Sequence, residues 1–203
     1  MTRLLVASRN RKKLAELRRV LDAAALSALT LVSLDDVRAF DETPETAATF
    51  EDNALAKARD GFAATGLPTV ADDSGLEVAA LNGMPGVLSA RWAGVHGDDG
   101  ANIALLLAQL RDVPDERRGA AFVSACALVS KSGEVVVRGE WPGAIAREPR
   151  GDGGFGYDPV FLPDGFACTA AQLRPDEKDA VSHRGRALAL LLPALRALAA
   201  DTR

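Results

Sequence analysis

The chain has 203 residues, of which 48% are hydrophobic and 26% are charged, and its formal net charge is -4. This length and composition favour one compact domain over residues 1–203 with its own core. The acidic balance excludes a protein that coats nucleic acid through clustered basic residues.

The cysteines and apolar stretches exclude further classes of protein. Cys126 and Cys168 stand far apart and lack metal-ligand spacing, so the sequence predicts neither a disulfide framework nor a zinc site. The apolar stretch from Ala187 to Leu195 is shorter than the ~20 residues that span a bilayer. We therefore expect a soluble, cytoplasmic protein without a membrane partner.

The first predicted elements are a strand, a helix and a second helix. Leu4 to Ala7 is apolar throughout, as in a buried strand, and a helix with one apolar face follows from about Arg11. The next helix begins near Thr49, where Thr49 and Asp52 resemble a capping box, and ends at Gly66.

The later elements predict a mixed α/β sheet covered by helices. They are a strand from Thr69 to Asp73, a helix from Ala101 to Leu110, strands at Ala120 to Val129 and Glu134 to Arg138, and a helix from Ala187 to Ala199 bent at Pro193. Strands and helices alternate, and the hairpin formed by the last two strands adds antiparallel pairing, so the sheet should not be purely parallel.

A polar, basic segment follows the first strand at Ser8-Arg9-Asn10-Arg11-Lys12-Lys13. Unpaired backbone N–H groups and the helix dipole favour an anion at such a turn, and polyphosphate is the expected ligand. A solvated first turn with Asn10 as N-cap explains this segment equally well. A P-loop is excluded, because the GxxxxGK[ST] pattern is absent.

Two adjacent carboxylates, Asp72 and Asp73, end the predicted strand before Ser74 and Gly75. Neighbouring residues of a strand point to opposite faces, so only one of the two can easily face a given site. Asp73 is the better candidate for holding magnesium, and Asp72 would support it. An Asp-Asp-Ser-Gly turn without a ligand is the alternative.

The remaining candidates are a lysine, a glycine-rich loop and a second basic helix start. Lys57 could reach a phosphate from the edge of the Thr49 helix, or pair with Asp60 at the surface. In the loop from Gly151 to Pro159, a purine could stack on Phe155. Alternatively, Phe155 and Tyr157 could pack into the hydrophobic core and close the loop. Near the last helix stand Lys178, Ser182 as its expected cap, His183 and Arg184.

Taken together, these segments resemble the inosine/xanthosine triphosphate pyrophosphatase family, whose members remove non-standard purine nucleotides. The resemblance covers nearly the whole chain and rests on Ser8-X-Asn10-X-X-Lys13, Glu45, Phe50-X-X-Asn53-Ala54-X-X-Lys57-Ala58-Arg59, Ala71-Asp72-Asp73-Ser74-Gly75, Pro85-Gly86, Ser89-Ala90-Arg91, Gly153-Gly154-Phe155-Gly156-Tyr157-Asp158-Pro159, Glu177-Lys178 and Ser182-His183-Arg184-Gly185. It implies an elongated mixed sheet with two lobes and a cleft, and a homodimer. Ser8 stands where threonine is frequent in that family.

The resemblance also implies roles for individual residues. Glu45 and Asp73 would hold Mg²⁺, and Asp73 would also accept a proton from the attacking water. Lys57 would add positive charge near the phosphates. The substrate-binding residues would be Ser8, Arg9, Asn10, Arg11, Lys12, Lys13, Ser74, Phe155, Gly156, Tyr157, Asp158, Lys178, His183 and Arg184.

The expected reaction is hydrolysis of ITP, dITP and XTP to the monophosphate and pyrophosphate, with water attacking the α-phosphorus. Two other classes remain open. A septum-protein-like pyrophosphatase acting on modified pyrimidines would use similar chemistry, and a nucleotide-binding module without catalysis would not release pyrophosphate.

Overall fold

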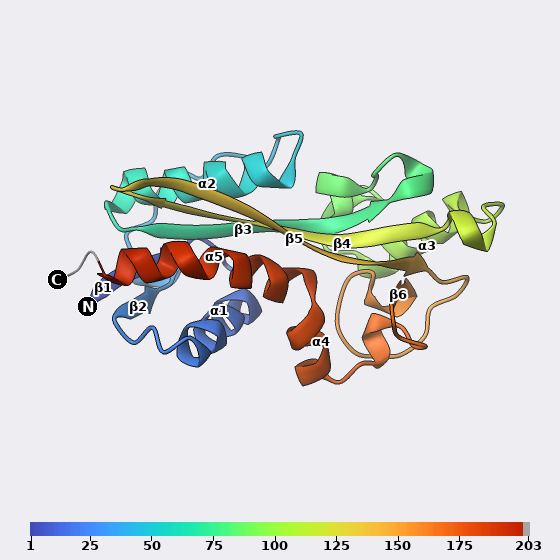
Figure 1. The fold of residues 1–203 in the computed structure, drawn as a ribbon. Helices are drawn as coiled ribbons and strands as arrows, with labels where there is room; N and C mark the ends of the chain where they lie inside the picture. The colour runs from blue at the N-terminus through green and yellow to red at the C-terminus, as the bar shows by residue number, and fades with distance from the viewer. Residues whose placement is uncertain (201–203) are drawn as a thin grey trace. The chain divides into compact units, whose positions relative to one another are not determined.

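The computed structural model describes residues 1–200, except for the side chains of residues 11, 12, 175, 176 and 179. Six strands form one sheet in the order β2-β1-β3-β4-β5-β6. The strands are β1 (Thr2–Val6), β2 (Leu29–Val32), β3 (Thr69–Val78), β4 (Gly119–Ser130), β5 (Gly133–Ile145) and β6 (Phe161–Pro163). The α-helices are α1 (Arg11–Ala23), α2 (Phe50–Thr65), α3 (Asp99–Gln109), α4 (Pro175–Val181) and α5 (His183–Ala200) (Figure 1).

The sheet is mixed, as the sequence predicts. Strand β1 runs parallel to both β2 and β3, with Leu5 opposite Thr69 and Val6 opposite Val70. Strand β5 runs antiparallel to β6, with Ile145 opposite Phe161. The predicted α/β class with helices on a mixed sheet is therefore confirmed.

The contacts within the chain divide it into two compact units. Unit 1 comprises Met1–Asp73, Ser124–Gly139 and the residues from Arg184 onward, and unit 2 comprises Ser74–Val123 and Glu140–His183. The division agrees with the two predicted lobes. The assignment of residues 1–203 to a single domain stays a prediction.

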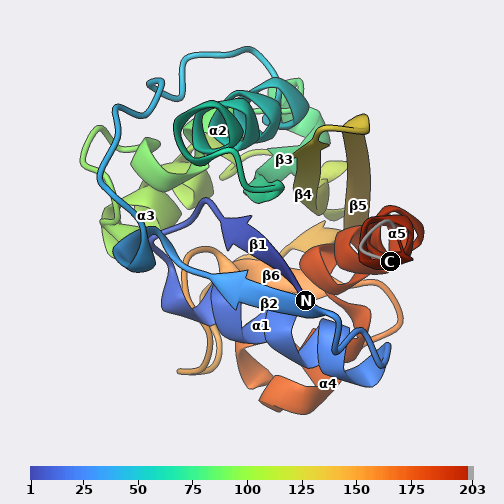
Figure 2. The same cartoon turned by 90° about the vertical axis from the view of Figure 1, so that its left-hand side faces the viewer.

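Unit 1 packs helices on both faces of its part of the sheet. Helix α2 covers one face, and α1 and α5 cover the other (Figures 1 and 2). The core on the second face joins apolar residues of β1, α1 and α5, including Leu4, Leu17 and Leu191, which are at most 2% exposed. Alternation along the strands sends successive residues to the two faces.

Unit 2 has a separate core built around aromatic side chains. Phe122 of β4 lies 4.5 Å from Phe161 of β6 between ring centroids, and Trp141 of β5 lies 5.5 Å from Phe161. Leu106 and Leu110, from α3 and the residue that follows it, pack into the same cluster. Because α3 is anchored there, its first turn is held in a defined position.

The bounds of α2 follow from the residues at its ends. The Thr49 side chain accepts a hydrogen bond from the Asp52 backbone N–H at 3.1 Å, which satisfies one of the first orphan donors. Gly66 ends the helix in the left-handed conformation with φ of 69°, where a side chain would be strained. Both predicted bounds are confirmed.

Two expectations about local structure are wrong. Strand β3 does not end at Asp73 but continues to Val78, so the two aspartates lie within a strand rather than after it. Helix α5 begins at His183 rather than near Ala187. Ser182 directly precedes α5, where the sequence places it, but it is also the C-terminal cap residue of α4, a short helix that the sequence pattern does not predict.

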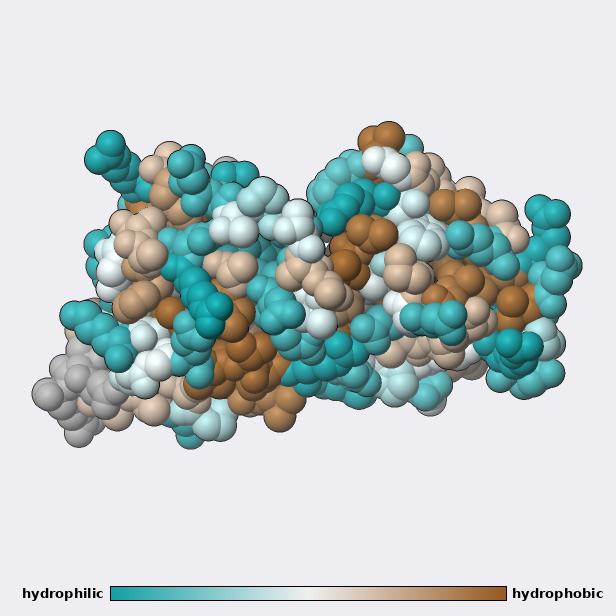
Figure 3. Space-filling model, turned by 90° about the horizontal axis from the view of Figure 1, so that it is seen from above, coloured by the Kyte–Doolittle hydropathy of each residue, from teal (hydrophilic) through white to brown (hydrophobic). Residues whose placement is uncertain are grey.

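No described helix is long and apolar enough to cross a membrane. The face of the molecule seen in Figure 3 mixes polar residues with smaller groups of apolar ones.

Candidate active site

Asp72 and Asp73 contact different groups of residues, because they are neighbours in strand β3 and point to opposite faces of the sheet. Asp73 meets residues of α2 and of the segment before it, whereas Asp72 meets residues of α1 and α5. The strand therefore supports two charged clusters in unit 1, one on each face.

The Asp73 cluster contains an amide, an ammonium and a second carboxylate. Asn53 Nδ2 donates to Asp73 Oδ2 at 3.0 Å. Lys57 Nζ lies 3.7 Å from Asp73 Oδ1 and 2.9 Å from Glu45 Oε1. Asn53 and Lys57 are four residues apart on α2, so both side chains leave the same face of that helix. Asn53 Oδ1 also accepts the Ala47 N–H at 3.0 Å, which holds the segment that carries Glu45.

The pKa values in this cluster shift in a direction suited to proton transfer. Burial raises the pKa of the Asp73 carboxyl, and Glu45 adds to the rise, whereas Lys57 and the hydrogen bond from Asn53 oppose it. Burial alone would lower the pKa of Lys57, but the Asp73 and Glu45 carboxylates outweigh it and raise that pKa. Asp73 is therefore a stronger base than an exposed aspartate, beside a lysine that stays charged.

Glu45 and Asp73 can hold a hard divalent cation. Both carboxylates already contact one cationic group, the Lys57 ammonium, so they lie close enough to share a charge. Mg²⁺ binds through one or two carboxylates together with water and substrate phosphates, so these two residues suffice. Among the described residues, no group of three or more His, Cys, Asp or Glu side chains could form a complete protein cage.

The Asp72 cluster is a chain of alternating charges. Lys13 Nζ lies 2.7 Å from Asp72 Oδ2, and Arg184 Nε lies 3.5 Å from the same oxygen. Arg184 Nη1 lies 3.2 Å from Glu16 Oε2. Burial alone would raise the pKa of the Asp72 carboxyl, but Lys13 and Arg184 lower it to about 2.

This depressed pKa predicts an acid-sensitive contribution to stability. A group whose pKa is lower in the folded chain stabilises the fold above its unfolded pKa, near 3.8, and loses that contribution as the pH falls through about 2. The shift corresponds to about 2 kcal/mol. Between roughly pH 5 and pH 2, the unfolding free energy of the native chain should fall by about 2 kcal/mol more than the unfolding free energy of Asp72→Asn does. Urea unfolding across this range measures the difference, and parallel curves for the two proteins would contradict it.

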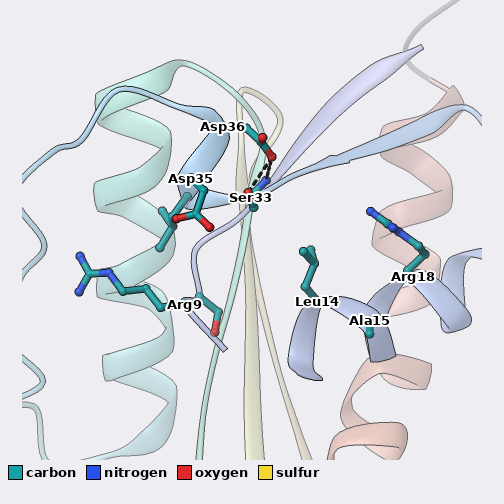
Figure 4. Close-up of a pocket in the computed structure, with 9 residues that line it drawn as sticks. Arg9, Leu14, Ala15, Arg18, Ser33, Asp35 and Asp36 are labelled. Atoms are coloured by element: carbon teal, nitrogen blue, oxygen red, sulfur yellow. Dashed lines mark hydrogen bonds between the residues drawn. The ribbon is translucent and has the colours of Figure 1, made fainter. Parts of the chain in front are cut away.

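The predicted phosphate segment lies at the start of α1. Ser8 Oγ accepts the Asn10 N–H at 3.2 Å, and the Arg9 guanidinium pairs with Glu42. Ser8 and Arg9 also line a hollow of about 540 Å³, with Arg18 and Asp35 on its walls (Figure 4). The side chains of Arg11 and Lys12 lie outside the described part of the structure.

The glycine-rich loop of unit 2 is held by carboxylates. Asp158 Oδ2 accepts the Phe155 N–H at 2.8 Å and pairs with Lys178. The Lys178 ammonium lies 5.0 Å from the centroid of the Phe155 ring, and that side chain is 48% exposed. Asp99 Oδ2 of α3 accepts the Gly156 N–H at 2.6 Å. The loop thus presents an exposed aromatic face beside a cation.

Gly154 is the position of this loop least tolerant of a side chain. It has φ of 78°, and a Cβ there would lie 2.0 Å from Asp158 Oδ2. Gly165 has a similar φ of 84° but nothing within 4 Å, so Gly165→Ala isolates the backbone strain. We expect Gly154→Ala to lower the unfolding free energy by roughly 1–3 kcal/mol more than Gly165→Ala does. Urea unfolding of both variants tests this, and equal losses would argue against the close contact.

Other predicted residues of unit 2 are more buried. Tyr157 is 4% exposed, and its hydroxyl donates to the Ser89 carbonyl at 2.9 Å. Burial raises the pKa of this hydroxyl, and the negative charge of Asp99 raises it further. His183 is 7% exposed and stacks on Phe122 at 5.0 Å between ring centroids. Ser74 is half-buried in the part of β3 that belongs to unit 2.

The structure adds three residues to the predicted set. Asn53 binds Asp73, Glu16 binds Arg184, and Asp99 binds the glycine loop. Two of these had a signal in the sequence, because Asn53 precedes Lys57 by four residues and Glu16 follows Lys13 by three, which are neighbouring positions on a helix surface. Asp99 had none, since the loop is 57 residues away in the sequence.

Comparisons with known proteins identify the family to which the chain is similar. The Ham1 family model matches residues 4–194. The chain is 83% identical over 199 residues to the dITP/XTP pyrophosphatase of Mycobacterium tuberculosis (strain ATCC 25618 / H37Rv), covering 98% of each protein. The solved structure of the nucleoside-triphosphatase / dITP/XTP pyrophosphatase of Mycobacterium abscessus matches with a TM-score of 0.83 at 69% identity, over 96% of this chain and 100% of that one. The Ham1 protein of Staphylococcus aureus matches with a TM-score of 0.88 at 35% identity, over 97% and 100%. The chain therefore belongs to the Ham1 family.

Proposed function

We propose that the chain hydrolyses ITP, dITP and XTP to the corresponding monophosphate and pyrophosphate, which removes non-standard purines from the nucleotide pool. The observation that carries the proposal is the Asp73 cluster, in which two carboxylates share one ammonium group. A module that only binds nucleotides has no need for a buried carboxylate with a raised pKa beside a second carboxylate. The names of the relatives support the same activity.

Glu45 and Asp73 would hold Mg²⁺ through their carboxylate oxygens. When bound, the ion would neutralise charge on the phosphate oxygens and favour departure of pyrophosphate. Asn53 keeps the Asp73 carboxylate in one orientation through its amide. Lys57 and Lys13 supply the positive charge that the chain itself offers to the phosphates.

Asp73 accepts the proton of the water that attacks the α-phosphorus. The new P–O bond forms on that water as the bond to the bridging oxygen breaks, and that oxygen leaves with pyrophosphate. Burial raises the pKa of Asp73 in the chain by itself, whereas a bound cation would lower it, so the placement of the carboxylate rather than its basicity carries this step. General-base help of this kind is typically worth ~10²–10⁴-fold.

The base would stack on the exposed Phe155 ring, with Gly156, Asp158 and Lys178 around it. Inosine and xanthosine carry an acceptor oxygen at position 6 where adenosine carries an amino donor. Hydrogen-bond donors such as Lys178 or Arg184 would therefore favour them, since adenine leaves such donors unpaired. Tyr157, His183 and Ser74 would contribute as the resemblance implies.

A substrate panel tests the proposal directly. The purified chain is assayed with inosine, deoxyinosine, xanthosine, adenosine, guanosine and pyrimidine triphosphates, with magnesium and with a chelator, and both products are identified. We expect magnesium-dependent release of monophosphate and pyrophosphate from the inosine, deoxyinosine and xanthosine nucleotides. Diphosphate with orthophosphate, or equal rates on ATP and GTP, would contradict it.

Two other outcomes of the panel point elsewhere. Turnover confined to modified pyrimidines would favour a septum-protein-like pyrophosphatase, and binding without turnover would favour a nucleotide-binding module. We also propose that the active form is a homodimer, which sedimentation analysis of the purified chain checks.

A further inference from the structure

Two consecutive backbone amides of the glycine loop each donate to a carboxylate. The Phe155 N–H donates to Asp158 within the same loop, and the Gly156 N–H donates to Asp99 at 2.6 Å. Asp99 lies in the first turn of α3, 57 residues earlier in the sequence. It therefore ties the loop to a helix of unit 2.

The loop is also held on both sides of this tie, because the Gly153 N–H donates to the Ala171 carbonyl at 3.2 Å and Tyr157 is 4% exposed. The bond to Asp99 acts between these points, directly after Phe155. Gly156 has φ of 58°, and Gly151 and Gly154 also adopt positive φ values. Glycines have the largest conformational freedom to lose on ordering. Phe155 is 48% exposed, and the Lys178 ammonium lies 5.0 Å from the centroid of its ring. The peptide groups on either side of Phe155 set the direction in which its side chain leaves the backbone.

Helix α3 offers a firm anchor for the tie. Asp98 caps the helix by accepting the Ala101 N–H at 3.0 Å. Asn102 accepts the Ala93 N–H at 2.7 Å and so joins the helix to the segment before it. Leu106 on the same helix is fully buried in the core of unit 2. A carboxylate on such an element holds its acceptor oxygen in a fixed place, and a charged acceptor makes a stronger bond than a neutral one.

We propose that Asp99 is a positioning residue for recognition of the purine base. By fixing the Phe155–Gly156 peptide, Asp99 orients the Phe155 ring before the substrate arrives, so binding does not have to order the loop. This inference rests on the proposed function, in which Phe155 carries the base. It also means that the Phe155 and Gly156 amides are already hydrogen-bonded to carboxylates before the substrate arrives.

The test compares three variants of the full chain. Asp99→Ala removes the acceptor, whereas Asp99→Asn keeps a neutral acceptor oxygen at the same place. Asp98→Asn is the matched control, because it removes the neighbouring negative charge but keeps an oxygen that can cap α3 by accepting the Ala101 N–H.

The first readout needs no substrate. Hydrogen exchange at the Gly156 amide should accelerate by about tenfold or more in Asp99→Ala, because a hydrogen bond worth roughly one order of magnitude is lost. Asp99→Asn should stay near the native rate, and Asp98→Asn, which keeps the helix cap, should leave the loop unchanged. Unchanged exchange in Asp99→Ala would overturn the positioning role, whatever reaction the chain catalyses.

The second readout is the kinetics with dITP and XTP. Asp99→Ala should raise KM by about tenfold with kcat within about threefold, since the ordering cost falls on binding, and Asp99→Asn should recover most of the loss. Faster exchange with unchanged KM would overturn the link between the loop and the base. An equal KM rise in Asp98→Asn would also overturn it. If the native chain does not turn over dITP or XTP, the proposed function is overturned instead. The exchange data would still decide whether Asp99 holds the loop.

Discussion

Asp73→Asn should lower kcat on dITP and XTP by at least ~10²-fold and leave the fold intact. The substitution keeps the shape of the side chain and an oxygen that can accept from Asn53, so the contact at 3.0 Å can persist. It removes the buried base and one of the two carboxylates that contact Lys57. Proton transfer and cation binding should therefore both fail. Steady-state rates at saturating magnesium, with product identification, measure the effect.

The control for this variant removes an acid elsewhere in unit 1. Glu134 pairs with Arg59 on the surface at 2.6 Å, and Glu134→Gln should turn over at close to the native rate. The Tm of Asp73→Asn should stay within about 4 °C of the native value, because Lys57 retains Glu45 as a partner. Asp73→Asn with near-native kcat would remove Asp73 from the mechanism.

Lys13→Ala should lower kcat/KM by about 10²–10³-fold, the usual effect of losing one charge-stabilising donor in an active site. Within the predicted phosphate segment, the Lys13 ammonium pairs with the Asp72 carboxylate at 2.7 Å. Its side chain is 19% exposed, so part of that side chain is accessible from solvent. A phosphate would then share the lysine with Asp72.

Loss of Lys13 also changes the charge balance around Asp72, so stability has to be measured in parallel. Arg184 remains 3.5 Å from Asp72 and still pairs with it, so the loss of stability should be smaller than if Asp72 had no partner. Lys13→Arg keeps a positive charge there and should recover stability more completely than activity, since a guanidinium group differs in shape from an ammonium group. Arg19→Ala removes an exposed cation of the same helix and should leave the rates unchanged. Equal losses in Lys13→Ala and Arg19→Ala would mean that only net charge matters.

The local elements of the fold could be predicted because their signals are short in range. Thr49 with Asp52 and the glycine at position 66 mark the ends of α2, and each signal acts through hydrogen bonds or backbone strain within a few residues. The apolar run at the start of the chain identifies β1 in the same way. The continuation of β3 beyond Asp73 had no such signal, because Ser74 and Gly75 favour a turn when they are considered alone.

The clustering of the site could be predicted only in part. Strand alternation by itself separates Asp72 from Asp73, and the structure agrees, with Lys13 on one carboxylate and Lys57 on the other. The sequence did not indicate that the two lysines would be divided between these carboxylates. That division depends on which helix covers which face of the sheet.

By itself, the sequence determined the α/β class, the bounds of α2 and the residue types from which the candidate site is built, because these depend on composition, periodicity and local hydrogen bonding. Only the tertiary structure decided that Glu16 meets Arg184, that Lys57 joins Glu45 to Asp73, and that Asp99 holds Gly156. The physical reason is that contacts between distant segments arise from the packing of whole helices on the sheet, and no local pattern of residues encodes that packing.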